Sequence, residues 1–193
     1  MDIKKVSRVM DSLDSKKESQ VTTTVQHISP VTGKTMEQNL EKVIADFESE
    51  TGYKLQIKGG WPYYRGNLDL HGTSITSLPD GLVVDGNLDL EDCTGITSLP
   101  NDLAVGGLLD LSGTGITSLP NDLVVGGNLD LYNTSITFLP NDLTVGGNLY
   151  LRGTSITSLP NDLAVGGYLD LHGTGITSLP KGLTEGYSNP RQH

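Results

Sequence analysis

The sequence is poor in cysteine, in long apolar runs and, over its second part, in basic residues. Its single cysteine, Cys93, cannot form an intramolecular disulfide, and a thiolate zinc site would lack its other ligands. No apolar run approaches the roughly 18 residues that a membrane-spanning helix needs. No Walker or Rossmann glycine pattern is present. We therefore expect a protein that crosses no membrane and holds no metal and no cofactor.

Basic residues are scarce over one part of the chain only. Residues 61–193 carry four Lys/Arg and fourteen Asp/Glu, whereas residues 1–60 carry nine of each, so the net charge of −10 belongs to the second part. Because nucleic-acid affinity comes largely from Lys and Arg, direct binding to nucleic acid or to an anionic membrane is disfavoured. The N-terminus lacks the apolar core of a secretory signal. We expect a cytoplasmic protein, and secretion without a signal peptide stays open.

Glycine, by contrast, is abundant, with 24 residues in 193, and it belongs to a repeat. A Ser-Leu-Pro or Phe-Leu-Pro tripeptide recurs at spacings of 21, 20, 20, 20 and 20 residues, with its prolines at Pro79, Pro100, Pro120, Pro140, Pro160 and Pro180. A unit this short cannot hold its own core, so its apolar side chains must stack on those of the next unit.

Each unit predicts one short strand and a return. The alternation Leu-x-Leu, as in Leu68 and Leu70, indicates a strand with both leucines inward, and successive strands would form a parallel sheet. The Leu-Pro segment predicts a return that is either extended or a tight turn, without a long helix. Gly-Gly pairs such as Gly126 and Gly127 predict positive φ and close backbone approach at the strand entrance. Six threonines would form an internal ladder of hydroxyls: Thr73, Thr94, Thr114, Thr134, Thr154 and Thr174.

The spacing L-x-L-x-x-T-x-I-x-x-L-P resembles the leucine-rich repeat, in the short subtype of secreted bacterial effectors and of bacterial and prophage proteins. The resemblance covers six repeats over residues 66–185. It implies an α/β repeat fold: a right-handed solenoid with a concave parallel β-sheet, extended convex returns and a binding surface. It implies no catalysis.

The segments before and after the repeats predict additional structural elements. Residues 1–34 predict an N-terminal arm, with a helix and a strand. Residues 35–65 predict a small helical and aromatic cap, in which a capping box of Thr35 and Gln38 opens a helix that ends near Gly52. Residues 186–193 form a short tail. The last strand, around Leu169 to Leu171, would then have a free edge, which suggests a homodimer through this end.

Two groups of residues are candidates for binding. Trp61, Tyr63 and Tyr64 either pack the cap or form a secondary partner-binding site, since aromatics are enriched in binding hot spots. The other group lies beside the strand leucines, on the predicted concave face. We expect its partner-binding residues to be Tyr132, Tyr150, Arg152, Tyr168, His172, Asp110, Asp130 and Asp170.

Three rows of side chains make up this concave face. The first row is Asn67, Asn87, Leu108, Asn128, Asn148 and Tyr168; the second is Asp69, Asp89, Asp110, Asp130, Tyr150 and Asp170; the third is His71, Glu91, Ser112, Tyr132, Arg152 and His172. The aspartates are either an acidic groove for a basic protein surface or copies made by duplication of the unit. The positions where copies differ are more informative, and drift on an exposed face is the competing interpretation.

Enzymatic chemistry has little support in the sequence. His71 and His172 lie five coils apart, about 24 Å, and cannot share a proton relay. Cys93 occupies a position expected to face the core. His71 and Glu91 lie in adjacent coils and could touch, but no nucleophile accompanies them. The main hypothesis is a non-enzymatic module that binds or inhibits another protein, and this partner would have a basic or mixed surface. The alternatives are an acidic mimic of nucleic acid that blocks a DNA- or RNA-binding enzyme, and a self-assembling structural protein.

Overall fold

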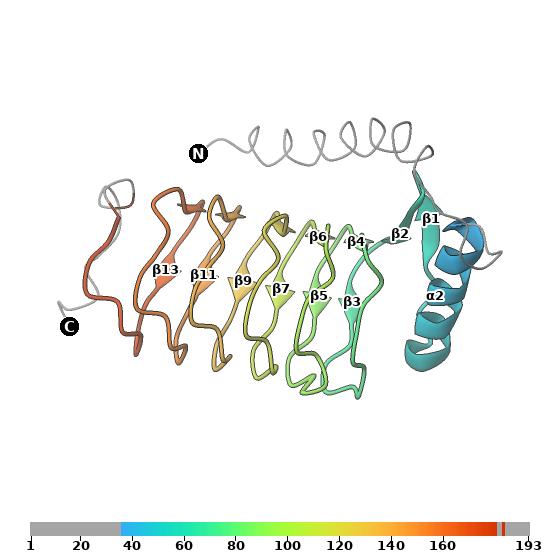
Figure 1. Ribbon diagram of the computed structural model, residues 1–193, viewed down its shortest axis with the longest axis horizontal. Coiled ribbons are helices and arrows are strands. Elements are labelled where there is room, and N and C mark those ends of the chain that lie inside the picture. The colour runs from blue at the N-terminus through green and yellow to red at the C-terminus, as the bar shows by residue number, and fades with distance from the viewer. Residues whose placement is uncertain (1–35, 181–182, 184–193) are drawn as a thin grey trace.

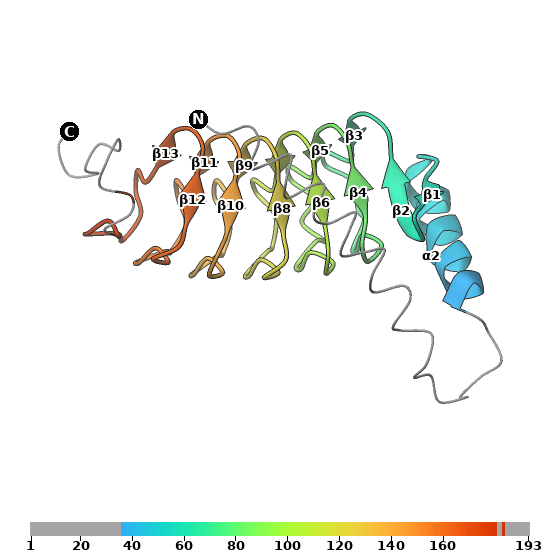
Figure 2. The same ribbon diagram turned by 90° about the horizontal axis from the view of Figure 1, so that it is seen from above.

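The computed structural model describes residues 36–180 and Leu183. Within them, one N-terminal helix precedes a β-solenoid whose coils stack in an elongated row (Figure 1). Two sheets run along this row on different sides of it (Figures 1 and 2). No helix in this part of the chain is long and apolar enough to span a membrane.

The first sheet contains the predicted Leu-x-Leu segments, and we call it the Leu-Asp sheet. Its parallel strands are β3 (Leu68–Asp69), β5 (Leu88–Asp89), β7 (Leu109–Asp110), β9 (Leu129–Asp130), β11 (Leu149–Tyr150) and β13 (Leu169–Asp170). The leading leucines pair strand by strand, so the five steps from Leu68 to Leu169 are 20, 21, 20, 20 and 20 residues. The solenoid of 20-residue repeats and its parallel sheet are therefore confirmed, and the solenoid has about five turns.

The second sheet lies on the return of each coil, and we call it the return sheet. Its strands are β1 (Gln56–Lys58), β2 (Trp61–Tyr64), β4 (Val83–Val84), β6 (Ala104–Val105), β8 (Val124–Val125), β10 (Thr144–Val145) and β12 (Ala164–Val165). All pairs are parallel except β1 with β2. This second sheet was not predicted, although its signal was present: Leu82 and Val84 alternate as a strand requires, and both are fully buried.

One continuous apolar core fills the space inside the coils. It combines the leucines of the Leu-Asp sheet and the leucines and valines of the returns with an isoleucine from each coil, such as Ile96, Ile116 and Ile136, which are fully buried. Burying a side chain of this kind contributes about 1.5–3 kcal/mol. Because each coil has few such side chains of its own, this energy is gained only when neighbouring coils stack.

A polar ladder inside the corner supports the core, as predicted, except at one coil. Five threonine hydroxyls each donate to the carbonyl oxygen three residues earlier, at 2.6–2.9 Å: Thr73, Thr114, Thr134, Thr154 and Thr174. The prediction for Thr94 was wrong, since Thr94 is exposed. In this longer coil Cys93 lies three residues after Leu90, is fully buried as predicted, and its Sγ lies 2.8 Å from the carbonyl oxygen of Leu70.

The glycine pairs allow the backbones of adjacent coils to approach closely, as predicted. The other part of the prediction, a positive φ at these glycines, was wrong. A Cβ on Gly127 would lie 2.6 Å from the carbonyl carbon of Gly107 in the preceding coil. Positive φ instead occurs at the corner after the Leu-Asp strand, as at Gly72 (62°), Asp92 (57°) and Asn133 (56°). Asn and Asp tolerate this conformation better than other side chains, which explains why they replace glycine there.

The N-terminal element is α2 (Met36–Thr51), and it ends as predicted, where Gly52 takes a φ of 76°. Ile44 and Phe47 of this helix are buried in the same core as the coils. The hairpin of β1 and β2 then leads into the return sheet, where β2 pairs with β4.

Several predictions lie outside the described residues. They concern the arm 1–34, Thr35 of the capping box and the tail 186–193. Within the described part, β12 and β13 are the last strands of their sheets, and the homodimer through this end stays a prediction.

The close approach at Gly127 can be tested by substitution. Gly127→Ala should lower the free energy of unfolding by about 2 kcal/mol or more, because a backbone 2.6 Å away cannot yield without shifting a coil. The matched control is Gly115→Ala. There a Cβ would meet its nearest atom at 3.4 Å, and Ser135 and Ser155 occupy the equivalent position in other coils. Urea unfolding of both variants checks this; equal losses of stability would contradict it.

Candidate binding surface

The outward surface of the Leu-Asp sheet carries the three predicted rows, and we call it the Asp face. The strand leucines beneath it are at most 7% exposed, whereas the residues that alternate with them are half-buried or exposed, except Ser112, which is buried. The pairing of Asp69 with Asp89, and so on to Asp170, places each row in register from coil to coil.

The aspartates of the middle row have a structural task. Each accepts the backbone N–H of the residue two positions later, at 2.8–3.1 Å, and so closes the corner after the strand. The donors are His71, Glu91, Ser112, Tyr132 and His172, and the acceptors are Asp69, Asp89, Asp110, Asp130 and Asp170. The recurrence of aspartate thus follows from the local backbone and needs no partner.

The asparagines of the first row join adjacent coils. Their side-chain oxygens accept the backbone N–H of the equivalent residue in the next coil at 2.7–2.9 Å. The acceptors are Asn67, Asn87, Asn128 and Asn148, and the donors are Asn87, Leu108, Asn148 and Tyr168. A hydrogen bond of this kind contributes about 1 kcal/mol to stability. The first row therefore also recurs for a structural reason.

The middle row is nevertheless electrostatically unfavourable at its centre. Burial raises the pKa of Asp130, and the N–H of Tyr132 partly offsets this rise. The carboxylates of Asp110, Glu91 and Asp170 raise the same pKa further. A cation or a basic surface placed over this part of the face would lower that energy.

Most of the side chains that depart from the repeat make no such hydrogen bond. Tyr132 is 48% exposed and Tyr168 is 60% exposed, and Arg152 and His172 are exposed too. Tyr150 is half-buried, and its hydroxyl accepts a hydrogen bond from Asn148 at 2.8 Å. These five residues belong to the coils of β9, β11 and β13, which are three successive coils of one face. Asp130 and Asp170 of the predicted group lie in the same coils, and Asp110 lies one coil earlier, in β7.

The aromatic residues after the helix lie elsewhere, in β2 of the return sheet. Tyr63 is buried, and its hydrogen bond to Asp85 raises its pKa. The ammonium of Lys58 lies 4.8 Å from the centre of the Tyr63 ring. Tyr64 packs edge-on against Tyr53, with ring centres 5.5 Å apart. This packing matches the cap interpretation. A secondary binding site at Trp61, Tyr63 and Tyr64 stays a prediction, and it would not be continuous with the Asp face.

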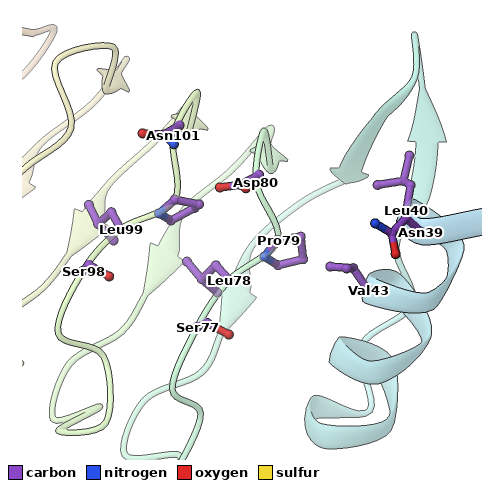
Figure 3. A pocket seen from close by; sticks show the side chains of 11 residues that line it. Asn39, Leu40, Val43, Ser77, Leu78, Pro79, Asp80, Ser98, Leu99 and Asn101 are labelled. Carbon is purple, nitrogen blue, oxygen red and sulfur yellow. The ribbon is translucent and has the colours of Figure 1, made fainter. Parts of the chain in front are cut away.

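Sequence reasoning missed two surface features. Phe138 is 57% exposed at a position where other coils have serine, and the change from Ser-Leu-Pro to Phe-Leu-Pro was a visible signal. A cleft of about 500 Å³ lies between α2 and the first two returns. Val43 and Leu40 of the helix face Leu78 and Pro79 across it (Figure 3). Its lining offers serine hydroxyls and amides, with Asp80 as its one titratable side chain.

Comparisons of the chain with protein-family models, with curated proteins and with solved structures found no match. The chemistry of the Asp face and the geometry of the coils therefore carry the indications of function.

The raised pKa of Asp130 predicts a pH-dependent stability. The cost of ionising Asp130 in the folded state is fully present at neutral pH. It disappears as pH falls through the raised pKa towards the unfolded value of about 3.9. Asp130→Asn keeps an oxygen that can accept the N–H of Tyr132. We expect this variant to melt at a higher temperature than the native protein at pH 7, with a difference that shrinks towards pH 4.

The control for this experiment is Asp122→Asn, which removes an exposed carboxylate away from the face. Thermal unfolding between pH 4 and pH 8 provides the measurement. A stabilisation by Asp130→Asn that stays constant over this range would contradict the electrostatic explanation.

Proposed function

We propose that this protein is a non-enzymatic binding module that recognises another protein through the C-terminal part of the Asp face. The observation that carries the proposal is the exposure of Tyr132 and Tyr168 on the same face, with Arg152 in the coil between them. Tyrosine and arginine are enriched among the residues that dominate binding energy.

The contrast between constrained and unconstrained positions supports this choice. Aspartates and asparagines recur because the backbone uses their oxygens. Tyr132, Arg152 and His172 occupy the third row. In the described coils, Ser112 is the one residue of this row whose side chain forms a hydrogen bond within its own coil. Large side chains at such positions add contact area for a partner without serving the fold.

The charge of the face suggests the chemistry of the partner. Asp110, Asp130 and Asp170 surround the tyrosines, and the solenoid part of the chain carries most of the net negative charge. A partner with a basic or mixed surface would be attracted, and electrostatic attraction speeds the encounter. Asp130 and Asp170 flank Tyr150 within the proposed contact, and Asp110 lies at its edge.

A second candidate is an acidic mimic of nucleic acid, favoured by four carboxylates in register on consecutive coils, from Asp69 to Asp130. Such a mimic would occupy the basic channel of a DNA- or RNA-binding enzyme. Its binding would fall steeply with salt, and DNA would compete for the same partner.

The class of the solenoid is also a proposal. We propose a right-handed leucine-rich repeat of the short bacterial and prophage type, because the L-x-L-x-x-T-x-I-x-x-L-P spacing fits the coils from β3 to β13. The Asp face would then be the concave face. The return sheet is an addition that this resemblance did not imply.

The proposed contact is tested by affinity capture followed by mass spectrometry. Tyr132→Ala combined with Arg152→Ala should reduce capture of the specific partner at least tenfold, because two hot-spot side chains are lost, while the melting temperature stays the same. The matched control is Phe138→Ser, which removes another exposed aromatic and restores the residue found in other coils.

Each outcome of this capture experiment has a clear meaning. Capture that survives the double substitution contradicts the proposed site, as does loss with Phe138→Ser alone. Capture that DNA displaces and that disappears at high salt favours the acidic mimic over the tyrosine contact.

A further inference from the structure

A side-chain cluster at the other end of the Asp face has the composition of a metal site, although the sequence predicted none. His71, Asp89 and Glu91 each offer a ligand atom, and these atoms all lie within 4.8 Å of one another. His71 and Glu91, which the sequence suggested could touch, do so: His71 Nδ1 lies 3.3 Å from Glu91 Oε2.

The separation of these atoms fits a tetrahedral ion. Zinc binds imidazole nitrogen and carboxylate oxygen at about 2.0–2.2 Å, so two ligands of one tetrahedral ion lie about 3.4 Å apart. The distance between His71 and Glu91 already has this value, and small side-chain rotations would bring in Asp89. The set of one nitrogen and two oxygens suits a transition metal better than calcium.

The coils bring these residues together. Asp89 Oδ1 accepts the backbone N–H of Glu91 at 3.0 Å, which holds the Asp89 carboxylate beside the backbone of Glu91. The pairing of β3 with β5 brings the coil of His71 beside that of Glu91. Asp69 and Asp110 flank Asp89 in register, and their negative charge favours a cation here. All three ligands are partly or fully accessible to an ion from solvent.

We propose that His71, Asp89 and Glu91 bind a divalent transition metal such as Zn²⁺, with open coordination positions towards solvent. This inference concerns the N-terminal coils and is independent of the contact proposed at Tyr132 and Arg152. The competing explanation is a simple ion pair between a protonated His71 and Glu91. The metal site and the ion pair differ in the state of the imidazole. An ion pair needs a protonated imidazole, whereas a bound metal takes the place of the proton.

The chain provides its own control at the opposite end of the face. His172 occupies the same position in its coil, and its N–H also bonds to an aspartate, Asp170, at 2.9 Å. His71 has Glu91 and Asp89 of the following coil beside it. His172 lies in the last described coil of the Leu-Asp sheet, and the corresponding residues of the coil before it are Arg152 and Tyr150. Positive charge and a missing carboxylate should prevent metal binding at His172.

The experiment is calorimetric titration of the tag-free, full-length protein with Zn²⁺ at pH 7.5, after treatment with a chelator. We expect one ion per chain, with a dissociation constant at least tenfold weaker in His71→Ala and in Glu91→Gln, and unchanged in His172→Ala. Calcium should bind at least tenfold more weakly than zinc. Histidine ring resonances in NMR spectra should shift on zinc addition for His71 and not for His172.

These measurements leave the proposal open to refutation even if one variant folds poorly, because the NMR shifts are read on the native protein. No saturable binding, equal affinity for calcium, an equal loss in His172→Ala, or zinc shifts absent from the His71 ring would each overturn it.

Discussion

Each coil of this protein must approach the next closely enough for their backbones to form hydrogen bonds with each other. In the Leu-Asp sheet the N–H of Leu70 donates to Asp89 O at 2.9 Å, and Leu90 and Asp110 repeat the bond one coil later. On the return the direction reverses, as where Gly106 N donates to Val84 O at 2.8 Å. The period of 20 residues, the glycines at the strand entrances and the inward leucines all follow from this stacking. No coil can relax alone, because its core side chains are completed by its neighbours.

Because the coils must stack in this way, a residue that recurs in every copy can be explained by the fold and need not indicate function. A recurrent aspartate looks like an acidic groove when only the sequence is seen, but its oxygen closes the corner of each coil. Asparagine bonds to the next coil for a similar reason. Function is therefore best sought where copies differ: at Tyr132, Arg152 and Tyr168 near one end, and at His71 and Glu91 near the other. The two groups share one face and differ in chemistry, since one offers aromatic contact area and the other offers metal ligands.

Much of the fold could be predicted because its signals are local and periodic. Leu68-x-Leu70 predicts its strand, and the spacing of Pro79 and Pro100 predicts the stacking. The return sheet was missed although Leu82-x-Val84 has the same alternation. Thr94 was misplaced because the extra residue in its coil lies before the threonine, so that Cys93 takes the inward position. Hydrogen bonds from side chains to the backbone depend on corner geometry, which periodicity does not contain, and so the tasks of the aspartates and asparagines needed the structure.

The recurrent polar side chains of the Asp face are kept because the backbone uses their oxygens as hydrogen-bond acceptors. Native-state amide hydrogen exchange tests this explanation directly. The N–H groups of Tyr132 and His172 bond to aspartates, whereas Arg152 follows Tyr150, and within the described residues no side chain accepts its N–H. Because one such bond contributes about 1 kcal/mol, the amide of Arg152 should be protected several-fold to tenfold less than those of Tyr132 and His172. Equal protection of the three amides would contradict the account.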